Sequence, residues 1–213
     1  MPAWLRSLVL WLRSAAALVR ARWCPTGAIE VDAAPAPRKG LPPRLYAERM
    51  RRGACYVDGS SRRGRGGAGV YYAPGHPLNR AIRVPHGDNN VCELCAIYAA
   101  VAAHPRGEPL RIFSDSALAL KALDAASGGR GAGRLSATGV ALARATVALA
   151  RLRLSETVVA SVAAHADAEG NQVADALAAR GAEDGALAEL PRSGFLATLW
   201  LELGYLRRQL SSA

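Results

Sequence analysis

The sequence predicts an α/β fold, in which helices flank a mixed β-sheet. Apolar runs at 54–58 and 67–73 surround a glycine- and arginine-rich turn, and 79–85 adds a third run of the same kind. Alanine-rich helical patterns then alternate with two further apolar runs. Five strands, the first three antiparallel and the others parallel, with helices on the sheet faces, are the expected result.

The elements after the first three strands are assigned from periodicity and from stop signals. Residues 89–104 form an alanine-rich helical pattern that Pro105 ends, and 109–115 form a buried strand that ends in Asp115. Helices are predicted at 116–126 and 137–154, with a basic glycine-rich loop at 127–134 between them. A strand at 157–165 and a helix at 169–182, closed by Gly181, complete the pattern.

Charge and cysteine content limit the functional classes. The 213 residues carry a formal net charge of +10, which predicts a polyanionic partner such as nucleic acid. A GC-rich coding sequence, which enriches Arg, Ala and Gly together, is the alternative source of the excess. The four cysteines form no disulfide framework, which favours an intracellular, reducing compartment. Cys92 and Cys95 lie in an apolar helix without a second pair, so we interpret them as core residues and not as a zinc site.

The segments outside the predicted domain at 54–182 have their own character. Residues 1–23 contain no acid and place Arg6, Arg13 and Arg20 on one helical face, and arginine interrupts the apolar run before a membrane span is complete. This basic amphipathic segment is interpreted either as a mitochondrial targeting segment or as a helix that binds a membrane surface or a protein partner. Residues 24–53 are a Pro/Arg-rich linker, and 183–213 are an amphipathic helical extension that a partner could also contact. A mitochondrial and a nuclear location both remain open.

Acidic residues follow the predicted strands and begin the predicted helices. Asp58 and Asp115 end strands, whereas Glu93 and Asp175 lie near the starts of helices. An α/β sheet brings such positions to one edge crevice. Converging carboxylates repel one another, and divalent cations that prefer oxygen ligands, Mg²⁺ or Mn²⁺, relieve this repulsion. The pattern therefore predicts a carboxylate site for divalent metal ions.

Four segments in order resemble ribonuclease H of type 1 over about residues 54–182. They are "YVDGSSRRGRGGAG" at 56–69, "NNVCEL" at 89–94, "IFSDS" at 112–116 and "AHADAEGNQVADALA" at 164–178. The resemblance implies a five-stranded ribonuclease H fold and hydrolysis of the RNA strand of RNA/DNA hybrids. It also implies two Mg²⁺ ions per site, for which Mn²⁺ can substitute, products with 5′-phosphate and 3′-hydroxyl ends, and no small-molecule cofactor.

The resemblance also implies roles for individual residues. Asp58, Glu93, Asp115 and Asp175 match the family's metal ligands, and His165 matches a histidine that assists proton transfer or product release. Asn89 and Asn90 match a pair that contacts the minor groove of the hybrid, and a simple helix-capping role is the alternative. We expect further nucleic-acid contacts from residues of the first hairpin: Ser60, Arg62, Arg63 and Arg65.

Two positions depart from the family pattern. Asp88 and His86 stand where many members carry a threonine and an arginine that seat a DNA phosphate. An acid at this position repels phosphate, so the departure bears on how strictly the protein prefers hybrids. The main functional prediction is a metal-dependent ribonuclease H. The alternatives are a binding module of the same fold with little turnover, and an accessory subunit of a polymerase or retroelement complex.

Overall fold

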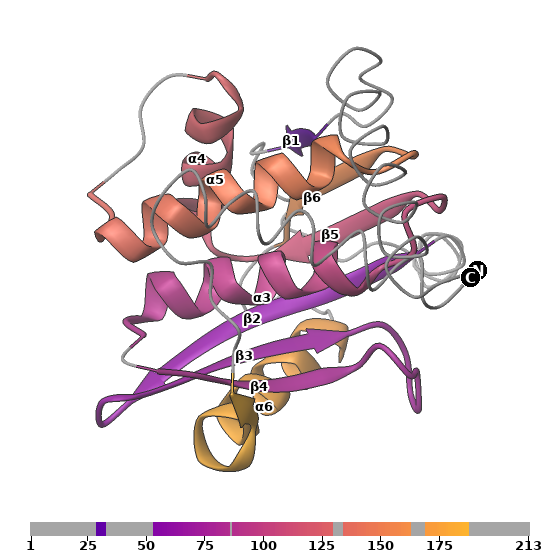
Figure 1. Ribbon diagram of the computed structural model, residues 1–213. Helices are drawn as coiled ribbons and strands as arrows, with labels where there is room; N and C mark the ends of the chain where they lie inside the picture. Colours follow the sequence, from indigo (N-terminus) through magenta and orange to yellow (C-terminus); the bar gives the residue numbers. More distant parts are fainter. Residues whose placement is uncertain (1–28, 33–52, 86, 130–133, 163–168, 188–213) are drawn as a thin grey trace, which may run out of the picture.

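A computed structural model describes residues 29–32, 53–85, 87–129, 134–162 and 169–187 of the chain. These residues form one seven-stranded sheet with helices on both faces (Figure 1). The strands are β1 (Ile29–Asp32), β2 (Ala54–Arg62), β3 (Arg65–Tyr71), β4 (Arg80–Val84), β5 (Leu110–Ser114), β6 (Thr157–Ser161) and β7 (Ala186–Leu187). The helices are α3 (Asn89–Ala103), α4 (Ala117–Ser127), α5 (Ala137–Arg151) and α6 (Glu169–Asp184).

The sheet order is β1-β6-β5-β2-β3-β4-β7. The hairpins β2–β3 and β3–β4 are antiparallel, whereas β5 and β6 join β2 in parallel, and this confirms the predicted α/β fold. The strand count is larger than predicted. β1 lies within the segment predicted as a linker and pairs in parallel with β6, and the two-residue β7 pairs with β4 in the segment predicted as an extension.

Two apolar clusters fix the layers. The larger one lies between the sheet and the helices α3, α4 and α5, and it includes Val57, Leu94, Ile112 and Leu142, together with the buried Cys92 and Cys95. The smaller one lies on the opposite face and includes Tyr56, Phe113 and Ala174, where α6 packs (Figure 1). The sheet is therefore covered by helices on both faces, as a mixed α/β sheet requires.

Glycines bring α6 unusually close to the hairpin strands. A Cβ atom on Gly69 of β3 would lie 2.1 Å from the carbonyl oxygen of Ala174, and one on Gly67 would lie 2.0 Å from that of Ala178. Gly181 was predicted to close this helix, but it lies within α6, where its missing side chain accommodates the backbone of Ile82 on β4. The close approach fixes the position of α6 relative to β2 and β3.

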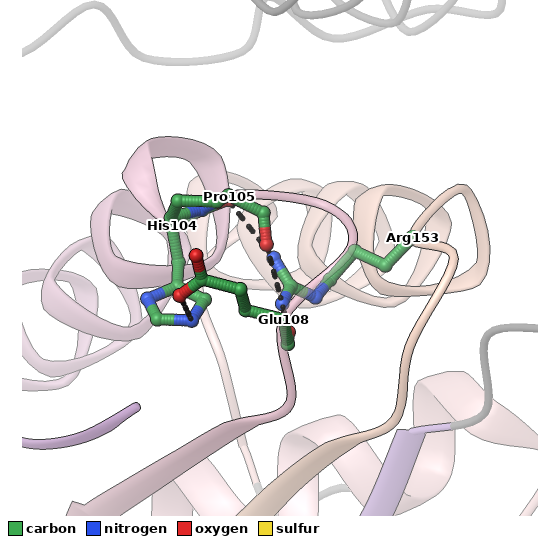
Figure 2. A network of polar contacts seen from close by, with 4 residues as sticks. All are labelled: His104, Pro105, Glu108 and Arg153. Atoms are coloured by element: carbon green, nitrogen blue, oxygen red, sulfur yellow. Dashed lines mark hydrogen bonds and ion pairs between the residues drawn. The ribbon is translucent and has the colours of Figure 1, made fainter. Parts of the chain in front are cut away.

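A buried arginine fastens the loop that joins α3 to β5. The Arg153 guanidinium is fully buried and donates to the backbone carbonyls of His104 (3.0 Å), Pro105 (3.1 Å) and Glu108 (Figure 2). His104 Nε2 lies 3.9 Å from Glu108 Oε2, but burial lowers the pKa of His104 to about 4, so this contact is not an ion pair at neutral pH. The arginine thus links three backbone carbonyls of this loop through a single buried guanidinium.

No helix among the described residues has the length and apolar character needed to span a bilayer. The predicted N-terminal segment at 1–23 and residues 188–213 of the predicted C-terminal extension lie outside the described residues, and so does His165.

Candidate active site

Three carboxylates meet at the centre of the sheet. Asp58, Glu93 and Asp115 each place one carboxylate oxygen within 4.8 Å of the others. They come from β2, from α3 and from the residue that directly follows β5. The structure therefore brings together three of the four acidic residues that the sequence analysis singled out.

Strand register and one glycine explain the convergence. Tyr56 pairs with Phe113 in the parallel β2–β5 ladder, so Asp58 and Asp115, two residues further along each strand, lie side by side. Gly59 follows Asp58, and a Cβ atom there would lie only 2.3 Å from the backbone nitrogen of Glu93. Because glycine has no side chain, the beginning of α3 can lie against β2 and bring Glu93 to the cluster.

Two details differ from the sequence predictions. Asp58 was expected to end the first strand, but β2 continues to Arg62, because Ser60, Ser61 and Arg62 pair with β3 beyond the carboxylate. Glu93 was expected near the start of its helix, and it lies just after the first turn, which contains no acid. Asp58 therefore occupies the middle of a long strand, where the backbone holds it firmly.

The cluster brings several carboxylates together in a place that water reaches poorly. Burial, reinforced by Asp58 and then by Asp115, raises the pKa of Glu93 to about 9. Burial, reinforced by Asp115 and more weakly by Asp175, raises the pKa of Asp58 to about 6, although the Gly59 N–H donates to Asp58 Oδ1 at 2.8 Å. Without a cation, the cluster therefore retains at least one proton at neutral pH.

The donor set fits hard divalent cations. Oxygen ligands are what Mg²⁺ and Mn²⁺ prefer, and the three carboxylates supply only oxygen. The buried Glu93 Oε2 has no hydrogen-bond partner among the described residues, so one acceptor is left for an ion. A bound divalent cation would both reduce the repulsion among the carboxylates and accept the unpaired Glu93 oxygen as a ligand.

Asp175 lies beside this cluster and not within it. Its side chain is exposed on α6, and it is not one of the three residues with converging oxygens, but its charge reaches Asp58. One turn earlier, the buried Asn171 donates from Nδ2 to Asp115 Oδ2 at 3.2 Å. Residues four apart share a helix face, so α6 presents both side chains to the same edge of the site.

Asn171 was missed in the sequence analysis. Its spacing of four residues before Asp175 on a predicted helix was a signal that both side chains share one helix face. Its partner Asp115 lies 56 residues away in sequence, however, so the contact itself depends on the fold. The amide orients the Asp115 carboxylate through one of its two oxygens. We therefore add Asn171 to the site as a positioning residue.

The predicted nucleic-acid contacts lie around the carboxylates. Ser60 is buried in β2, and the side chains of Arg62, Arg63 and Arg65 are exposed at the end of the β2–β3 hairpin. Asn89 is exposed and Asn90 is half-buried in the first turn of α3.

The capping role considered for the two asparagines is wrong. Asp88 is the N-cap of α3, and its carboxylate accepts from Val91 N at 2.8 Å. The exposed side chain of Asp88 therefore places a negative charge at the start of the helix.

Sequence comparison gives one family. Residues 51–183, more than half of the chain, match the family model described as RNase H. A search of curated proteins finds no match to the chain.

Proposed function

The chain belongs to the RNase H family, and from this premise we propose that it is a metal-dependent endonuclease that hydrolyses the RNA strand of RNA/DNA hybrids. Family membership supports a nuclease that acts on such hybrids. The observation that carries the finer proposal is the convergence of carboxylate oxygens of Asp58, Glu93 and Asp115 within 4.8 Å, with the first two side chains buried.

We assign the metal ligands to this chain's own carboxylates. Asp58, Glu93 and Asp115 would hold divalent ions, with Asp175 contributing from the exposed side, and Mg²⁺ or Mn²⁺ fits the oxygen donors. Two such ions would activate water and stabilise the leaving oxygen of a phosphodiester, leaving 5′-phosphate and 3′-hydroxyl ends.

The remaining residues position the reacting groups and the substrate. Asn171 holds Asp115 in one orientation through its 3.2 Å hydrogen bond, and the close packing of α6 on β3 fixes Asn171 in turn. Asn89 and Asn90 lie on the first turn of α3, four and three residues before Glu93, where their amides can contact 2′-hydroxyl groups. His165 would assist proton transfer or product release.

The test is cleavage of a hybrid in which the RNA strand is labelled, with Mg²⁺ or Mn²⁺ and with duplex RNA and duplex DNA as controls. The intact protein is compared with Asp115→Asn and with Asp184→Asn, which removes an exposed acid at the end of α6. We expect the intact protein and Asp184→Asn to cut only the RNA strand of the hybrid, and Asp115→Asn to be inactive. Equal cleavage by both variants, or none by the intact protein, would overturn the proposal.

A further inference from the structure

The β2–β3 hairpin extends well past the carboxylates as a preorganised element. Its strands pair residue for residue from Tyr56–Tyr71 to Arg62–Arg65, and a two-residue turn of Arg63 and Gly64 closes it. Both turn residues are left-handed, with φ of 52° and 77°, as a type I′ turn requires. Ser61 Oγ donates to the Gly87 carbonyl at 3.0 Å, which ties the hairpin to the approach of α3.

The end of this hairpin carries three arginines at positions where local structure disfavours them. Arg62 and Arg65 are directly opposite each other, and like charges in such a cross-strand pair destabilise a hairpin. Arg63 is the one non-glycine residue with positive φ among the described parts of the chain, at a position where asparagine or glycine is preferred. Residues that break local rules without benefit to the fold are expected at functional sites.

The three arginines have no internal partner that would explain them. Their side chains are exposed, and no ion pair or hydrogen bond joins them to another residue within the described ranges. Charged groups held in one place without a counter-ion are suited to an anionic ligand. We call Arg62, Arg63 and Arg65 the hairpin cation cluster.

The position of this cluster relative to the carboxylates sets which part of a substrate it can reach. Arg62 is four residues beyond Asp58 on one continuous strand, which corresponds to roughly 13 Å between their Cα atoms. A separation of this length spans several base pairs of a duplex, since even in B-form DNA successive base pairs are only about 3.4 Å apart. At the start of α3, by contrast, the Asp88 carboxylate already caps the helix and opposes phosphate.

We propose that the hairpin cation cluster is a phosphate clamp, which grips the backbone of the substrate duplex several base pairs to one side of the cut. The inference rests on the proposed function for the identity of the duplex. It adds that substrate binding is asymmetric about the cut, because the cluster lies on only one side of the carboxylates.

A variant that preserves the hairpin tests the clamp. Arg62→Thr, Arg63→Asn and Arg65→Thr together remove the charges, provide a favoured Asn-Gly turn and leave a cross-strand threonine pair. A matched control removes three exposed arginines away from the hairpin, Arg134, Arg144 and Arg151, each changed to Gln. Both triple variants lower the net charge equally.

The first readout is binding of a fluorescently labelled hybrid in EDTA, followed by anisotropy over a range of salt concentrations. Each phosphate contact contributes about 0.9 to the slope of log affinity against log salt, so we expect the hairpin variant to lose roughly 2 to 3 from this slope. The control variant should retain most of the slope of the intact protein. An unchanged slope in the hairpin variant, or an equal loss in the control, would overturn the clamp.

The second readout uses hybrids with a fixed cut position that are shortened from one end or the other. The intact protein should lose affinity when only about one or two base pairs remain on one side, whereas shortening the other side should have no such effect, and the hairpin variant should respond to neither side. Equal responses to both ends would overturn the asymmetry. A cleavage assay separates the two proposals. Binding that depends on the hairpin arginines, without cleavage, supports the clamp and refutes the nuclease. Cleavage with binding that does not depend on these arginines supports the nuclease and refutes the clamp.

Discussion

Replacing Glu93 by Gln should stabilise the metal-free protein while abolishing its metal site. The pKa of Glu93 is raised from 4.5 to about 9, mainly by burial and then by Asp58 and Asp115. The folded protein therefore binds the Glu93 proton more tightly than the unfolded chain does. Its contribution to stability is fully present below pH 4.5 and is lost progressively as the pH rises toward 9. Glutamine keeps the shape of the side chain and has no proton to lose.

The magnitude follows from this shift. At pH 7, roughly 2.5 units above the ordinary glutamate pKa, the cost of keeping Glu93 protonated is about 3 kcal/mol in the free energy of unfolding, at about 1.4 kcal/mol per unit. Removing this cost should raise the melting temperature by roughly 10 °C in a domain of this size. At pH 5 the same cost is below about 1 kcal/mol, so the two proteins should nearly coincide.

The assay is thermal unfolding in EDTA at pH 5, 7 and 8, with Glu156→Gln as the control because Glu156 is exposed and outside the cluster. Millimolar Mg²⁺ or Mn²⁺ should then stabilise the wild type more than the Glu93→Gln variant, because the ion binds only an intact carboxylate set. A Glu93→Gln variant that gains no stability at pH 8, or a gain that does not grow with pH, would refute the reasoning.

Three further predictions concern single residues. Gly59→Ala places a Cβ atom 2.3 Å from the backbone nitrogen of Glu93. Urea unfolding should show that the free energy of unfolding falls by about 2 kcal/mol or more, and hybrid cleavage should be lost. Wild-type stability would contradict the close approach of α3 to β2. Asn171→Ala frees Asp115 from its amide and should slow cleavage about tenfold without weakening binding of hybrid in EDTA; an unchanged rate would remove its positioning role. His104→Phe replaces the imidazole with an aromatic ring that cannot titrate. Because burial lowers the pKa of His104 to about 4, its contribution to stability is present above pH 6.5 and is lost as the pH falls toward 4. The variant should therefore lose less stability than the wild type between pH 6.5 and 4. Equal losses in urea titrations would show that His104 does not cause the loss of stability in acid.

The sequence was informative where a local pattern and the final structure agree. Apolar periodicity located α3 to α6 and the core strands within a few residues, because those elements bury one face. The acids at Asp58, Glu93 and Asp115 could be identified in advance, because each lies on or directly after a predicted element and the order of these elements in the fold brings them together.

The differences arise where long-range contacts override local signals. Glycine, serine and arginine after Asp58 indicate a turn, yet the β3 ladder extends β2 through them. Gly181 resembles a helix stop, but it is required inside α6 by the neighbouring backbone of Ile82. The Asn171–Asp115 contact joins elements 56 residues apart, and no local pattern encodes it.

The short strand β1 affects where a recombinant domain should begin. A fragment designed on the family match alone would start at residue 51 and would omit Ile29–Asp32. β6 would then lose the partner strand for Thr157 to Ala160 and present an unpaired edge to other molecules. Such edges promote self-association, so the shorter fragment should aggregate more readily than one that begins before Ile29.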